Sequence, residues 1–318
     1  MKLIDIAILT NIKGLGPVNI LKTLNYCKAH NINSIQELKD IDLSRIVSEK
    51  LANIIDSNLN SNFDTLYKNT QNMIDSYKQN NIHCLCINDE LYPKILKEST
   101  NPPVILYCRG NLDLLNSNCI ALIGTRENTS VGEKITSKTV EFLVKNNFTI
   151  VSGLAKGIDT IAHTATLTYK GSTIAIIPLI DKIYPEENNA LAQDILNNNG
   201  LLISEEKPGT HFYSAQFVKR DRLQSGLSKA VFVIESSSKG GSMHATHDAI
   251  KLKRPVFTPD IYKFDEKYQS LTQVEGIKNL IDSHKSISYT SKNYEEIITK
   301  LSLSDKGLIL RQELLILK

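Results

Sequence analysis

Two short turns that contain glycine and a basic residue follow two apolar runs of this sequence. Residues 120–123 lead into Gly124-Thr125-Arg126, and residues 149–151 lead into Ser152-Gly153-Leu154-Ala155-Lys156-Gly157. Continuous apolar runs without polar alternation are typical of buried parallel strands. Glycine lets the backbone approach a ligand, and the first N–H groups of a following helix attract anions. The pattern therefore predicts a phosphate-binding edge at which Arg126 and Lys156 add positive charge.

Two later segments carry residues that suit the same chemistry. Residues 241–243 open a helix after an apolar run. Residues 217–222 place three cations beside an aromatic ring. Cations hold a nucleic-acid backbone, while a ring can stack on an unpaired base. The residues that we expect to contact nucleic acid are Gly124, Thr125, Arg126, Ser152, Gly153, Lys156, Phe217, Lys219, Arg220, Arg222, Gly241, Ser242 and Met243.

Each of these residues also has a purely structural interpretation. An arginine at a turn often forms a structural ion pair, and Phe217 is equally consistent with core packing. The basic cluster of residues 219–222 is also typical of a solvated helix face, with Asp221 paired to a neighbouring arginine. Asp159 and His163 lie one helical turn apart, but a helix cap and a packed histidine explain them. We assign no residue a catalytic role.

From Cys119 onward, apolar runs alternate with helical patterns. Strands are expected at residues 120–123, 149–151, 173–177, 201–204, 230–234 and 255–258, with helices near 131–146, 159–169, 189–198, 219–227 and 241–252. Such alternation predicts an α/β fold with a doubly wound parallel sheet, an extended Rossmann-like arrangement. In this fold, ligands bind outside the carboxyl ends of the strands, where the strand order reverses. The predicted contact residues should therefore form one site.

The chain is expected to divide into four parts. Residues 1–78 show helical spacing and predict a small helical domain, and residues 79–118 predict a connecting segment packed on the large domain. Residues 119–285 form the Rossmann-like domain, and residues 286–318 a short helical tail. Within the helical domain, residues 12–18 resemble the hairpin of a helix-hairpin-helix element, whose N–H groups can meet a DNA phosphate. A glycine turn between packed helices explains the same residues.

Composition limits the classes of protein. The 318 residues include 37 basic and 34 acidic side chains, a net charge of only +3, so affinity for a polyanion requires a local patch. Apolar runs stay far below the about 20 residues of a membrane helix, and the first residues lack a signal-peptide pattern. We expect a cytoplasmic protein without membrane contact. The five cysteines form no CxxC pair, which favours reduced thiols and no metal site.

Several motifs, in order, resemble the DNA-processing protein A family, also called the Smf family. The motifs are the two turns described above together with Leu91-Tyr92-Pro93, Asn101-Pro102-Pro103, Tyr184-Pro185-Glu186, Ser204-Glu205, the segment 217–223 and Gly241-Ser242-Met243. The resemblance covers roughly residues 90–260. It implies a non-catalytic protein that binds and shields single-stranded DNA and passes it to a RecA-type recombinase in transformation or recombination. It also implies a homodimer formed through the large domain. We expect no cofactor.

Two of the departures from the family pattern bear directly on the expected phosphate contacts. Residues 177–181 replace glycines that the family places after the third strand. The family's F-P-x-R-N-R reads Phe217-Val218-Lys219-Arg220-Asp221-Arg222, which puts a carboxylate where the family has a neutral amide. A carboxylate beside DNA phosphate lowers affinity unless an arginine neutralises it.

These departures leave two other classes of function open. Proteins of the same fold type include nucleotide sensors and phosphoribohydrolases, which split a base from a nucleotide. Their P-G-G-x-G-T-x-x-E motif is absent; residues 239–244 are the nearest match and lack the glutamate. A degenerate relative that acts only as an interaction scaffold also fits the lost glycines. Neither a Walker motif nor paired carboxylates with metal spacing are present, so a binding protein is the simpler interpretation.

Overall fold

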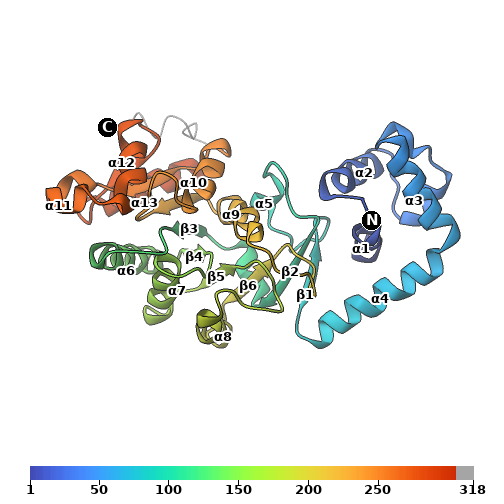
Figure 1. Ribbon diagram of the computed structural model, residues 1–318, viewed down its shortest axis with the longest axis horizontal. Coiled ribbons are helices and arrows are strands. Elements are labelled where there is room, and N and C mark those ends of the chain that lie inside the picture. The colour runs from blue at the N-terminus through green and yellow to red at the C-terminus, as the bar shows by residue number, and fades with distance from the viewer. Residues whose placement is uncertain (306–318) are drawn as a thin grey trace. The chain divides into compact units, whose positions relative to one another are not determined.

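The computed structural model describes residues 1–305, which form two compact units (Figure 1). The first unit consists of residues 1–92 and 100–108, and the second consists of residues 93–99 together with the chain from residue 109. Residues 79–118, expected as one connecting segment, are thus divided between the two units. No helix among the described residues is both long and apolar enough to cross a membrane.

The first unit is mainly helical. Its helices are α1 (Leu3–Asn11), α2 (Pro17–Ala29), α3 (Glu49–Ser61) and α4 (Phe63–Gln79). They bury apolar side chains, and Ile6, Leu9 and Ile55 are fully buried. The turn between α1 and α2 contains Gly14 at a φ of +93°, a conformation that favours glycine. The backbone conformation of this turn therefore explains why residue 14 is glycine, and a DNA contact is not needed to explain it.

Strands β1 (His83–Cys86) and β2 (Ile105–Gly110) follow the helices and pair antiparallel. Cys84 and Cys86 lie on β1 with one residue between them, and no disulfide links the five cysteines. Burial raises the pKa of the Cys27 thiol to about 11 and those of Cys84 and Cys86 to about 12. These thiols are therefore protonated at neutral pH.

The second unit is built on parallel strands, as the alternation of apolar runs predicted. In chain order they are β3 (Cys119–Ile123), β4 (Thr149–Ser152), β5 (Thr173–Ile176), β6 (Leu201–Ser204), β7 (Ala230–Val233), β8 (Val256–Pro259) and β9 (Ile287–Tyr289). In space their order is β6-β5-β4-β3-β7-β8-β9. The chain first builds outward from β3 to β6, then returns to place β7 on the other side of β3. The order thus reverses between β3 and β7, and the sheet is doubly wound.

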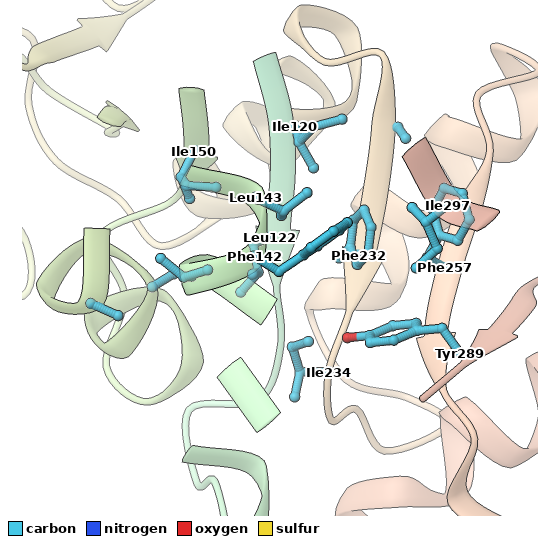
Figure 2. Close-up of a cluster of buried hydrophobic side chains, with 14 of the residues drawn as sticks. Ile120, Leu122, Phe142, Leu143, Ile150, Phe232, Ile234, Phe257, Tyr289 and Ile297 are labelled. Atoms are coloured by element: carbon cyan, nitrogen blue, oxygen red, sulfur yellow. The ribbon is translucent and has the colours of Figure 1, made fainter. Parts of the chain in front are cut away.

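Helices cover both faces of this sheet. They are α5 (Lys94–Lys97), α6 (Ser130–Lys145), α7 (Ile158–Thr168), α8 (Asn189–Asn197), α9 (Ala215–Leu227), α10 (Ser242–Lys251), α11 (Glu266–Gln269), α12 (Glu275–Asp282) and α13 (Tyr294–Asp305). Because side chains alternate along a strand, Ile120 and Leu122 of β3 join the core beneath α6, α7 and α13. Figure 2 shows this cluster, with Phe232 and Phe257 stacked at 4.8 Å between ring centroids. Ala121 and Ile123 enter the core on the opposite face.

The segment from residue 286 differs from the tail predicted for residues 286–318. It adds the parallel edge strand β9 beside β8 and then α13, whose Ile297 and Leu301 are buried in the core. Tyr294 stacks on Phe142 with ring centroids 4.2 Å apart. A three-residue strand is too short to stand out in the sequence, so β9 was not predicted. Residues 306–318 of the predicted tail lie outside the described residues.

Candidate functional site

A pocket of about 380 Å³ lies at the carboxyl ends of β3, β4 and β7, where the strand order reverses. This is where doubly wound folds bind ligands. Its walls come from the turns after the three strands and from α9. The lining residues are Ile123, Gly124, Thr125, Arg126, Glu127, Ala155, Asp159, Phe217, Arg220, Asp221, Gln224, Gly240, Gly241 and Ser242.

The glycines of the first two turns permit close packing. A Cβ on Gly124 would lie 2.5 Å from the Ile158 side chain, and one on Gly157 would lie 2.4 Å from the Thr125 carbonyl oxygen. Ile158 N–H donates to that same oxygen at 3.1 Å. The start of α7 is therefore held directly against the turn after β3. Gly124 and Thr125 line the pocket. The contacts of Gly124 and Gly157 show that packing alone requires glycine at both positions.

Arg220 is buried, with 3% exposure, and ties α9 to the turn after β4. Its guanidinium donates to the Gly153 carbonyl oxygen at 2.8 Å, and a Cβ on Gly153 would lie 1.9 Å from it. Arg220 also pairs with Asp221 at 2.9 Å and lies 3.9 Å from Asp159. The predicted pairing of Asp221 with a neighbouring arginine is thus present. Gly153 does not line the pocket, and its lack of a side chain leaves room for the Arg220 guanidinium.

Two buried acids surround this arginine. Burial raises the pKa of Asp221 to about 6, although Arg220 opposes the shift. Burial also raises the pKa of Asp159, whose carboxylate accepts N–H bonds from Gly153 and Ala155. The Asp159 carboxylate therefore fixes the loop before α7 by accepting two of its backbone N–H groups. The floor of the pocket can thus gain a proton slightly below neutral pH.

His163 lies behind the site and agrees with the interpretation as a packed histidine. It is fully buried, and its Nδ1 lies 2.7 Å from the Thr173 hydroxyl. Burial lowers its pKa to about 3, so the ring is neutral at physiological pH. It does not line the pocket.

Arg126 occupies the mouth of the pocket and is exposed to solvent. Its guanidinium lies 5.0 Å from the ring centroid of Phe217, within cation–π range. It makes no ion pair with any residue in the described part of the chain. Phe217 is half-buried and meets Phe212 edge-on at 5.5 Å, so it both packs and lines the pocket.

The other three predicted cations each pair with a glutamate. Lys156 lies 2.6 Å from Glu187, and Lys219 lies 2.5 Å from Glu206. Arg222 pairs with Glu205. Lys156 lines a smaller hollow beside the pocket, whereas Lys219 and Arg222 are not among the lining residues. These glutamates were missed from the sequence because they lie 13 to 31 residues from their partners.

The remaining predicted contacts are divided between the pocket and the core. Gly241 and Ser242 line the pocket at the start of α10, where the helix dipole favours an anion. The Met243 side chain is buried, and the Ser152 hydroxyl donates to the Leu122 carbonyl oxygen at 2.7 Å. Gln224 lines the pocket but was not predicted. Its position four residues after Arg220, on the same helix face, could have revealed it.

The fold and the pocket define a doubly wound, Rossmann-like α/β protein with a pocket at the switch point of the sheet, lined in part by an exposed arginine and the start of α10. The model of one family, DNA recombination-mediator protein A, matches residues 83–302. The chain belongs to this family, as the resemblance in the sequence predicted.

Proteins with curated names and solved structures agree. The chain is 35% identical to DNA processing protein DprA of Streptococcus pneumoniae over 251 residues, which cover 77% of this chain and 82% of that protein. It is 33% identical to Protein Smf of Synechocystis over 74% of its length, and it spans 58% of that relative. The X-ray structure of DNA processing protein A from Streptococcus pneumoniae superimposes with a TM-score of 0.72 at 29% identity, covering 92% of this chain and 96% of that one.

A second solved structure concerns DNA processing protein A of Helicobacter pylori and its single-stranded DNA binding mode. It superimposes with a TM-score of 0.60 at 30% identity and covers 69% of this chain and 96% of that one.

Proposed function

We propose that this protein binds single-stranded DNA at the switch-point pocket without cutting it. The observation that carries the proposal is Arg126, an exposed guanidinium without an ion-pair partner in the described chain, held over the Phe217 ring at the mouth of the pocket. A cation beside a ring suits a phosphate next to an unpaired base. The single-stranded DNA binding described for the Helicobacter pylori relative supports the same ligand.

In this proposal, each part of the pocket has a separate task. Arg126 and the start of α10 at Gly241 and Ser242 attract a phosphate, and Phe217 offers its ring to a base. Arg220 shapes the floor, since its charge is already engaged by Asp221. Lys156, Lys219 and Arg222 contact phosphates only after exchanging their glutamate partners.

We further propose that the protein works in the cytoplasm as a homodimer that shields the strand and assists loading of a RecA-type recombinase, in transformation or recombination. Membership of the recombination-mediator family supports this role. A dimer would present two pockets to one strand, and linked sites raise the apparent affinity. Sedimentation of the protein with and without an oligonucleotide tests the dimer.

Fluorescence anisotropy of a labelled oligothymidylate tests the binding itself. We expect Arg126→Ala to weaken binding by about tenfold, since a hydrogen bond to a charged group contributes about 1.5–3 kcal/mol. Lys145→Ala is the matched control, because it removes one exposed positive charge from α6, away from the pocket. Excess duplex should compete poorly.

Failure of the folded wild-type protein to bind at low salt would contradict the proposal. Binding of a mononucleotide under the same conditions would then favour the nucleotide-sensor alternative, since a pocket of about 380 Å³ is of the size that holds small ligands.

A further inference from the structure

Three hollows of the second unit adjoin one another. The switch-point pocket shares Arg126, Ala155 and Phe217 with a hollow of about 80 Å³, which is also lined by Pro185. The next residue, Glu186, lines a third cavity of about 320 Å³. The three hollows therefore follow one another from the turn after β3 to the loop after β5.

A row of aromatic rings connects the first hollow with the third. Phe217, beneath Arg126, meets Phe212 edge-on at 5.5 Å, and Phe212 stacks on Tyr184 at 3.9 Å. Lys182, which lines the third cavity, lies 5.1 Å from the Tyr184 ring centroid. The row thus carries a cation at each end, and its three rings are all partly exposed.

The third cavity contains an arginine that pairs with no carboxylate among the described residues. Arg109 lines it, and its Nε atom is buried with no hydrogen-bond acceptor. Neither acid of the cavity pairs with Arg109. Asp181 accepts from Gly209 N–H at 2.7 Å, and Glu186 lies 3.9 Å from Lys182 in the same cavity, an exposed pair that contributes little and can be exchanged for a phosphate. No ion pair to Arg109 occurs within residues 1–305. A guanidinium presented in this way matches the oxygens of a phosphate.

We infer that the bound single strand continues past the switch-point pocket, along the ring row, and into the third cavity. There Arg109 and Lys182 bind its backbone phosphate, while unpaired bases lie against Phe212 and Tyr184. Lys182 covers one face of Tyr184 on a long, flexible stem, so turning its ammonium toward a phosphate frees that face for a base. This inference rests on the proposed single-stranded DNA binding, and it adds a second anchoring site to it.

Strand length separates the two sites in an experiment. Affinity should be measured by anisotropy for oligothymidylates of about 4 to about 16 nucleotides, the range of site sizes known for single-strand binding folds. We expect Arg109→Gln and Tyr184→Leu each to weaken binding of the longest strands by about five- to tenfold and to leave the shortest bound strand unchanged. Arg126→Ala should weaken binding at every length. Tyr262→Leu is the matched control, an exposed tyrosine whose hydroxyl binds Asp282.

A second readout locates the contact directly. Strands that carry 5-iodouracil at successive positions should crosslink on irradiation to Tyr184 or Phe212 when the iodinated base lies several nucleotides from the one that crosslinks to Phe217. Equal losses of affinity at all lengths, or no loss at any length together with no crosslink to Tyr184 or Phe212, would overturn the inference while leaving the switch-point site intact. A folded wild type that binds no strand of any length would overturn both.

Discussion

Arg126 and Arg220 lie on the same pocket but have opposite surroundings. Arg220 is 3% exposed and is held by Asp221 and the Gly153 carbonyl oxygen, whereas Arg126 is exposed. Removing one partner of a buried ion pair leaves an uncompensated charge. The first arginine is thus mainly structural, and the second is available to a ligand.

We therefore expect Arg220→Ala to lower the free energy of unfolding by about 3–5 kcal/mol, the usual cost of breaking a buried pair. Arg126→Ala should change it by less than about 0.5 kcal/mol, as surface substitutions do. Urea unfolding followed by circular dichroism measures both. Equal stability of the two variants would show that Arg220 does not hold α9 against the turn after β4.

Asp221 gives the pocket a dependence on pH. Burial raises the pKa of its carboxyl to about 6 from an ordinary 3.8, while Arg220 and Arg126 oppose and Asp159 adds to the shift. Because the folded-state pKa lies above the unfolded value, the native state holds the extra proton between about pH 4 and about pH 6. Stability contributed by this proton is fully present below pH 4 and is lost as the pH rises through about 6.

Asp221→Asn should therefore bind single-stranded DNA about fivefold more tightly at pH 7.5, since removing one nearby negative charge contributes about 1 kcal/mol. At pH 5 the wild type should approach the affinity of the variant, because its own carboxyl is then protonated. Anisotropy titrations at both pH values test this. A ratio of wild-type to Asp221→Asn affinity that is the same at pH 5 and pH 7.5 would contradict the role of Asp221. A pH dependence shared by both proteins would come from other groups.

Helix α9 combines packing and exposed charge on different faces. Arg220 and Gln224 face the pocket and core, while Lys219 and Arg222 point to glutamates in the segment after β6. These pairs lower the charge that the helix presents to a phosphate. The basic cluster is thus neither a free binding surface nor a plain solvated face.

Removing one such glutamate should strengthen binding. Glu206→Gln releases Lys219 from its partner, and we expect affinity for single-stranded DNA to rise about two- to fivefold, as an exposed pair contributes about 0.2–1 kcal/mol. Glu141→Gln, which releases Lys138 and Lys145 on α6, serves as the control and should leave affinity unchanged. Equal gains in both variants would indicate a general effect of net charge.

Helix α13 completes the core of the sheet, although its sequence resembles an appended tail. Ile297 is 1% exposed and belongs to the cluster with Phe232 and Tyr289. Ile297→Ala should lower the free energy of unfolding by about 2–5 kcal/mol, the cost of a buried cavity of this size. Thr299→Ala, on the exposed side of the same helix, should have little effect. Denaturant unfolding compares the two, and similar midpoints would show that α13 contributes no core packing.

At the scale of the whole molecule, net charge says little about DNA affinity. The chain carries only +3, and three of the predicted cations are already neutralised by glutamates. Few counterions should therefore be released when a strand binds. The local arrangement of charge, and not its sum, sets the affinity.

This predicts a shallow salt dependence. The logarithm of the binding constant should fall with the logarithm of salt concentration with a slope of about −0.7 for each phosphate contact, and the total should correspond to two or three contacts. Arg126→Ala should reduce the slope by about 0.7. Anisotropy titrations at several salt concentrations give the slope, and a value equivalent to many contacts would mean that the strand displaces all three glutamates.

Local sequence determined the doubly wound sheet and the edge where the pocket lies. The runs that became β3 and β4 are continuous and apolar, and glycine turns follow them, so their burial and their ends can be recognised without knowing their neighbours. The position of Gly241 at the start of α10 was predictable for the same reason.

Only the tertiary structure decided what the charged residues do. Whether Lys156, Lys219 or Arg222 is free depends on glutamates brought near by other loops, and the burial of Arg220 depends on the space left by Gly153. Sequence spacing does not encode these distances, because electrostatic pairing and burial depend on separation in space. Edge strand β9 was also missed, since three residues pair only when a neighbouring strand is already in place.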